Sequence, residues 1–170
     1  MVTIVIGGAA SGKSEFAEAL VQTLPGQRVY VATMEPYDGE CLARIEKHRR
    51  QRAGKGFLTL ERYRDLGGLA VPAGANVLLE CMSNLLANEL YSPQGGGSAA
   101  VLGGVERLSQ RCAHLTIVTN EVFSGGCDYE GDTLRYLREL GAVNRALAAQ
   151  ADRVVEVVCG CPNVLKGRLP

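Results

Sequence analysis

Hydrophobic and polar positions along the chain form two kinds of segment that alternate. Short runs rich in β-branched residues, such as "VTIVI" at 2–6, are typical of buried strands. Longer segments, such as "KSEFAEALVQTL" at 13–24, carry apolar residues at helical spacing, and Pro25-Gly26 ends that helix. The complete pattern predicts strands at 2–6, 28–33, 54–62, 76–81, 115–121 and 152–160, and helices at 13–24, 38–52, 82–91, 99–112 and 133–151.

This alternation favours a mostly parallel sheet that is covered by helices on both faces. No internal repeat is visible, and no linker is long enough to divide the 170 residues. We therefore predict an α/β fold in a single domain over 1–170, with 152–160 as its last strand. In such sheets, ligands bind at the carboxyl ends of the strands.

Composition narrows the classes of protein that remain. Apolar residues make up 46% of the chain and charged residues 21%, which is typical of a globular protein. Lys and Arg number 18, as do Asp and Glu, and this balance argues against a dedicated nucleic-acid binder. No apolar run approaches the roughly 20 residues of a membrane span, and no targeting signal is visible. We expect a cytoplasmic protein.

The six cysteines show neither paired CxxC spacing nor the density of a disulfide-rich scaffold, which indicates reduced thiols. Cys159 and Cys161 form a CxC that could bind a metal ion. The end of a strand is the commoner explanation for such a pair.

The segment "GGAASGKS" at 7–14 fits the phosphate-binding pattern GxxxxGK[ST], and it lies between a predicted strand and a predicted helix. Small residues allow backbone N–H groups to approach phosphates, and the helix N-terminus adds its positive dipole end. In this pattern Lys13 reaches the β- and γ-phosphates, and the Ser14 hydroxyl ligates Mg²⁺. The segment predicts binding of a nucleoside triphosphate in a P-loop NTPase fold of the RecA-like kind.

A P-loop domain usually needs an acidic residue at the end of a nearby strand to hold the metal ion. Glu80 ends "NVLLE" and Glu121 ends "LTIVTNE", and either could be a solvated carboxylate at a strand end. We prefer Glu80 as the ligand of Mg²⁺ and expect Glu121 to be a polar contact in the same crevice.

His48 lies in a basic helical segment. If 38–52 is helical, Arg44, His48 and Arg52 share one face, while Leu42 and Ile45 turn toward the core. Nearby cations disfavour the imidazolium form, and a neutral imidazole is a nucleophile. The stripe fits covalent nucleotidyl transfer, although a solvated basic helix is the commoner structure.

The chain resembles the bifunctional adenosylcobinamide kinase/adenosylcobinamide-phosphate guanylyltransferases of cobalamin biosynthesis. Beyond the P-loop, the resemblance rests on "YVAT" (30–33), "RIEKHR" (44–49), "LLEC" (78–81), "VTNEVFSGG" (118–126) and the segment 140–158. It implies phosphorylation of adenosylcobinamide by ATP or GTP. Transfer of GMP from GTP then follows through a covalent GMP-histidine, and the product is adenosylcobinamide-GDP.

The resemblance also implies roles for particular residues. His48 would be the nucleophile, and Lys13 would act in the phosphate site. Residues expected to contact the nucleotide are Gly7, Gly8, Ala9, Ala10, Ser11, Gly12, Lys13, Ser14, Ala32, Thr33, Met34, Arg49, Arg50, Gln51, Arg52, Glu61 and Glu80. The partners implied are a small-molecule corrinoid and a nucleoside triphosphate, in a homo-oligomer.

Two alternatives stay open at this point. The chain could be a monofunctional P-loop kinase of a small molecule, in which His48 is idle. It could also be a nucleotide-binding regulatory module without transfer chemistry. Replacing His48 by alanine separates the first from the bifunctional enzyme. Slow turnover with every candidate acceptor, together with a nucleotide-dependent partner, would favour the second.

Overall fold

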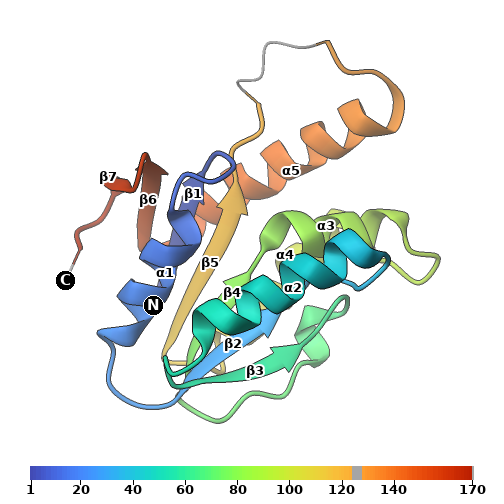
Figure 1. The fold of residues 1–170 in the computed structure, drawn as a ribbon. Coiled ribbons are helices and arrows are strands. Elements are labelled where there is room, and N and C mark those ends of the chain that lie inside the picture. The colour runs from blue at the N-terminus through green and yellow to red at the C-terminus, as the bar shows by residue number, and fades with distance from the viewer. Residues whose placement is uncertain (124–127, 170) are drawn as a thin grey trace.

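The computed structural model describes residues 1–123 and 128–169. Its elements are β1 (Val2–Gly7), α1 (Lys13–Gln22), β2 (Arg28–Ala32), α2 (Gly39–Arg52), β3 (Phe57–Glu61), the 3₁₀ helix η1 (Leu66–Gly68), β4 (Asn76–Glu80), α3 (Met82–Tyr91), α4 (Gly97–Ser109), β5 (His114–Asn120), α5 (Gly131–Gln150), β6 (Arg153–Val158) and β7 (Cys161–Lys166). The predicted strands and helices are confirmed, with boundaries that shift by a few residues (Figure 1).

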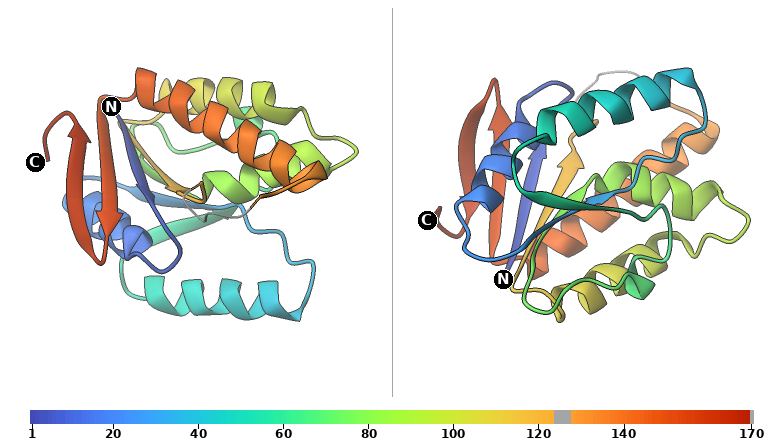
Figure 2. Two further views of the ribbon diagram at one scale, coloured as in Figure 1. Left: turned by 90° about the horizontal axis from the view of Figure 1, so that it is seen from above. Right: turned by 60° about the horizontal axis from the view of Figure 1, so that its bottom comes forward.

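The strands form one sheet in the order β3-β2-β4-β5-β1-β6-β7. Within the described residues, every pairing is parallel except that of β6 with β7. Helices α1 and α2 lie on one face of the sheet, and α3, α4 and α5 cover the other (Figure 2). The predicted α/β sheet with helices on both faces is therefore confirmed.

Each face of the sheet has its own apolar core because successive residues of a strand point to opposite sides. On β4, Leu78 packs with Ala17 and Val21 of α1. Its neighbour Leu79 packs with the residues of α3, α4 and α5 on the other face. Both leucines are fully buried, so the central strands are covered on both sides, as parallel strands require.

The strand β7 is absent from the sequence prediction, which ended the sheet at 160. It is an antiparallel edge strand whose six residues are all exposed, so no alternation of buried and exposed positions marks it. It is joined to β6 by a two-residue turn in which Cys159 and Gly160 have φ angles of 51° and 77°. Positive φ at both positions is the geometry of a tight hairpin turn.

Helix α2 lies apart from the sheet (Figure 2). Arg52, in its last turn, is its one buried residue. The expectation that Leu42 turns toward the core is wrong, since Leu42 is 55% exposed. Ile45 is half-buried and lines a crevice rather than the core. Most residues of α2 are charged or polar, so the helix has too few apolar residues to dock on the sheet along its length.

Two further features bear on the class of protein. None of the five cysteines in the described ranges takes part in a disulfide, and the sixth, Cys127, lies outside those ranges. Over residues 1–123 and 128–169, the helices are too short or too polar to span a lipid bilayer.

Candidate active site

The loop between β1 and α1 has the geometry that its glycines predict. Gly12 has a φ angle of 88° and precedes Lys13, the first residue of α1. A Cβ atom at Gly7 would lie 2.5 Å from Ser11 Oγ and 2.6 Å from Val157 O, so a larger residue does not fit. The loop therefore keeps its backbone close to the start of α1, whose unpaired N–H groups and dipole favour an anion.

Two neighbouring segments brace this loop. The Gly160 N–H, at the tip of the β6–β7 turn, donates to Ser11 O at 2.8 Å. On the other side, the Glu121 N–H donates to Gly7 O at 2.9 Å. The loop is thus held from the ends of two strands before any phosphate binds.

Lys13, Ser14 and Glu80 meet at the carboxyl end of the sheet. Lys13 is 9% exposed, and its Nζ donates to Gly8 O at 3.0 Å. The Ser14 hydroxyl donates to Glu80 Oε1 at 2.7 Å. Burial raises the pKa of Glu80 to about 7, although the Ser14 hydrogen bond and the Lys13 charge oppose that shift. A hydroxyl and a carboxylate side by side are the hard oxygen donors that suit Mg²⁺.

The strand order separates the two candidate acids. Glu80 ends β4, and its carboxylate reaches Ser14 although β5 lies between β4 and β1. Glu121 follows β5, and its Oε1 accepts a hydrogen bond from the N–H of Phe123 within its own loop. The geometry therefore favours Glu80 as the residue that would complete a metal site with Ser14.

A crevice of about 700 Å³ lies between the P-loop and α2, a volume typical of small-molecule sites. Its walls are the P-loop with the first turns of α1 and the inner side of α2. Its floor is formed by the ends of the central strands. The lining residues are Ala9, Ala10, Ser11, Gly12, Lys13, Ser14, Glu15, Glu18, Tyr30, Ala32, Met34, Arg44, Ile45, Lys47, His48, Gln51, Arg52, Lys55, Glu80, Cys81, Asn84, Asn120 and Val122.

His48 faces this crevice and is half-buried there. Burial, followed by the Arg52 cation, lowers the pKa of His48, and Lys47 and Arg44 act in the same direction. The Glu18 carboxylate opposes the shift. The expected direction is confirmed, with burial as the larger cause. The neutral imidazole is the prevailing form at neutral pH.

The C-terminal end of α2 is anchored to the rest of the domain. The guanidinium of Arg52 lies 3.6 Å from the centre of the Tyr30 ring. Just after the helix, Lys55 Nζ lies 2.5 Å from Glu18 Oε2, and Glu18 is itself buried. Arg52 Nε is buried and has no hydrogen-bond partner among the described residues, so this guanidinium retains a donor for a ligand in the crevice.

Some of the residues that the sequence placed at the nucleotide lie elsewhere. Arg49 Nη2 donates to Glu61 Oε1 at 2.6 Å, and both line a second hollow between α2 and β3. Arg50 is paired with Glu46, and neither side chain lines the crevice. Thr33 is fully buried, and its hydroxyl donates to the carbonyl oxygen of Cys81 at 2.8 Å.

Glu18, Tyr30, Lys55, Asn84 and Asn120 were absent from the predicted set of site residues, although all of them line the crevice. Glu18 lies four residues after Ser14 on the predicted helix α1, which places both on one side of that helix. That spacing is the one local signal. The others reach the crevice through the way the strands and helices pack together, which no local pattern encodes.

A phosphate-binding loop between the first strand and the first helix of a mostly parallel sheet defines a P-loop NTPase fold. An ATPase from the type III secretion system of pathogenic bacteria shares this fold, with a TM-score of 0.51 and 12% identity. That match covers 91% of this chain and 50% of the ATPase chain. The chain belongs to the cobinamide kinase / cobinamide phosphate guanyltransferase family, whose model matches residues 3–165.

Curated relatives agree with this membership. The chain is 37% identical over 179 residues to the bifunctional adenosylcobalamin biosynthesis protein CobU of Escherichia coli (strain K12), and the match covers 94% of this chain and 97% of the relative. Identity and coverage are the same for CobU of Salmonella typhimurium. The bifunctional adenosylcobalamin biosynthesis protein CobP of Pseudomonas aeruginosa is 33% identical, with 98% of both chains covered. The family resemblance seen in the sequence is confirmed.

Proposed function

We propose that this chain phosphorylates adenosylcobinamide with ATP or GTP and then transfers GMP from GTP to the phosphorylated corrinoid, through a covalent bond to His48. The observation that carries the proposal is the position of His48. Its imidazole faces the P-loop across one crevice, with a pKa lowered by burial and by cations. One crevice can therefore serve phosphoryl transfer at the P-loop and guanylyl transfer at the histidine.

The phosphoryl step depends on positioning and on neutralising charge. The backbone N–H groups of 7–14 and the start of α1 would bind the triphosphate, with Lys13 beside the β- and γ-phosphates. The Ser11 Oγ is buried in this loop and has no hydrogen-bond partner among the residues that the structure describes, which leaves its hydroxyl for the same ligand. Ser14 and Glu80 would hold Mg²⁺, which neutralises phosphate charge when it is bound. Ala32 and Met34 line the crevice floor, where the nucleotide would pass.

The guanylyl step forms and breaks one bond at the α-phosphorus. The lone pair of a neutral His48 nitrogen attacks that phosphorus, and an N–P bond forms. The bond from the α-phosphorus to the bridging oxygen breaks, and its electron pair leaves with pyrophosphate. The hydrogen on the other ring nitrogen stays on the ring. An oxygen of the corrinoid phosphate then attacks the same phosphorus, and the N–P bond breaks to return the histidine.

The remaining parts of the proposal rest on the family resemblance. Gln51 and Arg52 face the crevice and would contact the nucleotide there. Thr33, Arg49, Arg50 and Glu61 stay predictions, because their contacts in the structure lie outside this crevice. We also propose a single domain over 1–170, a homo-oligomer and a cytoplasmic location.

The proposal is tested with GTP labelled at the α-phosphate and Mg²⁺, without acceptor, followed by denaturation and intact-mass analysis. We expect one acid-labile guanylyl group per chain in the wild type and none in His48→Ala. The kinase step of His48→Ala, assayed with adenosylcobinamide, should persist. If His48→Ala keeps both activities, guanylyl transfer does not use His48. If the wild type forms no adduct and shows kinase activity alone, the chain is a kinase in which the histidine is idle.

A further inference from the structure

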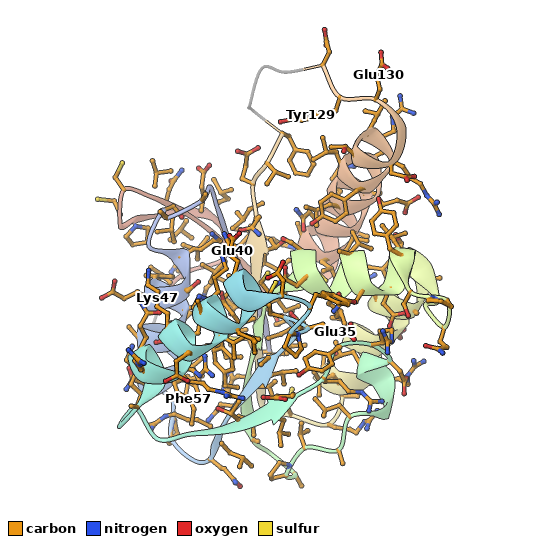
Figure 3. The ribbon with its side chains drawn as sticks, turned by 45° about the vertical axis from the view of Figure 1, so that its right-hand side comes forward. Glu35, Glu40, Lys47, Phe57, Tyr129 and Glu130 are labelled. Atoms are coloured by element: carbon orange, nitrogen blue, oxygen red, sulfur yellow. The ribbon has the colours of Figure 1, made fainter. Side chains whose placement is uncertain are left out.

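The cations of α2 lie on two different sides of the helix. Arg44 and Lys47 line the crevice together with His48. Figure 3 shows Lys47 on the side of α2 that is turned toward α1. Arg49 and Arg50, by contrast, contact Glu61 and Glu46 outside the crevice. Residues 44, 47, 48 and 51 are three or four apart, so helix geometry brings them to one face.

The cations that line the crevice from α2 and from the loop just after it differ in their partners. Arg52 is stacked over Tyr30, and Lys55 is paired with buried Glu18, so both are held in place by the domain. Arg44 has a 3.7 Å pair with Glu40 in which both side chains are more than 60% exposed, and such pairs contribute little. Lys47 makes no ion pair with any residue in 1–123 or 128–169. Two cations beside the imidazole are therefore available to an anion.

We infer that Arg44 and Lys47 bind the non-bridging oxygens of the phosphoryl group that His48 accepts and donates. This inference rests on the function proposed above. The site is separate from the P-loop, which binds the β- and γ-phosphates, and its ligand is the α-phosphoryl group of a guanine nucleotide. It assigns a catalytic role to two residues outside the predicted nucleotide-binding set.

The geometry of displacement at phosphorus supports separate sites for the α-phosphoryl group and for the β- and γ-phosphates. The entering and leaving groups lie in line on opposite sides of the phosphorus atom, and the three other oxygen positions lie around its equator. With the imidazole on one side, the leaving pyrophosphate lies on the P-loop side of the crevice. The equatorial oxygens are then next to the helix face that carries His48.

Their place on the same helix adds a second consequence. The backbone positions of Arg44 and Lys47 relative to His48 stay the same in any orientation of α2, because all three residues belong to one helix. The same two cations therefore neutralise the phosphoryl group both when it arrives from GTP and when it leaves for an acceptor. Cations that are already in position where negative charge develops in the transition state lower the barrier of the reaction.

The test measures the rate of His48 guanylylation from α-labelled GTP in a single turnover, for the wild type, Lys47→Ala and Arg44→Ala. The assay is run well above the ordinary histidine pKa, so that a change in imidazole protonation does not contribute. We expect each variant to be slower by roughly 10- to 100-fold. The reverse reaction, loss of the adduct on adding pyrophosphate, should slow by a similar factor.

Arg138→Ala is the matched control, because Arg138 is an exposed cation on α5, outside the crevice lining. It should form the adduct at the wild-type rate. Replacing an oxygen of the α-phosphate by sulfur adds a second test. Its result should not change in the variants if the two cations have only a structural role. With GTP that carries sulfur on the α-phosphorus, the wild type should prefer one diastereomer, and Lys47→Ala should lose much of that preference.

The outcomes separate this inference from the proposed function. If the wild type forms no adduct, the guanylyl transfer itself is wrong. If the wild type forms the adduct and both variants match it in rate and diastereomer preference, His48 is the nucleophile and the role of Arg44 and Lys47 is wrong. Equal binding of a fluorescent GTP analogue by all variants shows that the P-loop is intact.

Discussion

At the residue scale, the crevice brings several cations and one carboxylate close to a single imidazole. His48 faces the cations Arg44, Lys47 and Arg52 and the carboxylate of Glu18. Burial disfavours a charged imidazole, and three cations against one carboxylate disfavour it further. The side chain that we propose as nucleophile is thus kept in the form that can attack phosphorus.

The first prediction concerns the pH dependence of guanylylation. The neutral imidazole reacts, and the pKa of His48 lies below its ordinary value of 6.5. The rate of adduct formation should therefore fall with decreasing pH along a titration whose midpoint lies below 6.5. Single-turnover rates over a pH series check this. A midpoint at or above 6.5 in that series would contradict the lowered pKa.

A second prediction concerns Glu80 and the metal ion. In Glu80→Gln the buried oxygen still accepts from Ser14, but the negative charge that would hold Mg²⁺ is lost. Even an outer-shell partner of a metal ligand costs roughly 10- to 100-fold in metal affinity when it is lost, so the loss of this carboxylate should cost at least as much. We expect the Mg²⁺ concentration for half-maximal kinase rate to rise by at least that factor. Glu121→Gln is the comparison, and a rise in that variant without one in Glu80→Gln would assign the metal to Glu121 instead.

At the scale of elements, α2 is attached to the domain mainly at one end. Arg52 stacks on Tyr30, and Lys55 pairs with Glu18 just beyond the helix. The ion pairs Arg44–Glu40 and Arg50–Glu46 lie within the helix itself and do not tie it to the sheet. Few buried contacts and an exposed backbone are the conditions for local opening.

The third prediction follows from this attachment. The backbone amides of α2 should exchange hydrogen for deuterium faster than those of α1 or α3, which pack on the sheet. Lys55→Ala should speed exchange in α2 further, since it leaves the buried Glu18 carboxylate without its partner. The control is Lys166→Ala, which removes an exposed lysine side chain of β7. Equal protection of α2 and α3 would show that the helix is docked more firmly than its contacts indicate.

The elements differ in how far the sequence could predict them. The P-loop was predictable because a strand, a glycine-rich turn and a helix are contiguous and each has a local pattern. Leu42 was misplaced because helical periodicity identifies a face but does not say whether another element covers it. The choice between Glu80 and Glu121 depended on the order of strands, and the pair of Glu18 with Lys55 joins positions that no local pattern relates.

At the scale of the whole molecule, one sheet separates two apolar cores. Leu78 belongs to the core under α1, and Leu79 belongs to the core under α3, α4 and α5. Both lie on β4, in the middle of the sheet. Neither core can lose its packing without affecting the strand that they share.

The fourth prediction is that the two cores unfold together, as a single domain over 1–170 would. Leu78→Ala and Leu79→Ala should each lower the free energy of unfolding by about 2–5 kcal/mol, the usual cost of removing a buried leucine side chain. Denaturant unfolding followed by circular dichroism and by tyrosine fluorescence should give one coincident transition for each variant. Two separate transitions would show that the faces are independent units.

The contact between the β6–β7 turn and the P-loop has a consequence for the order of assembly. The P-loop lies within the first 14 residues, yet one of the backbone hydrogen bonds that hold it comes from Gly160. A ribosome therefore makes residues 7–14 well before it makes the residue that braces them. The support that the Gly160 N–H gives to the loop is therefore available to a bound nucleotide only once the β6–β7 hairpin has formed.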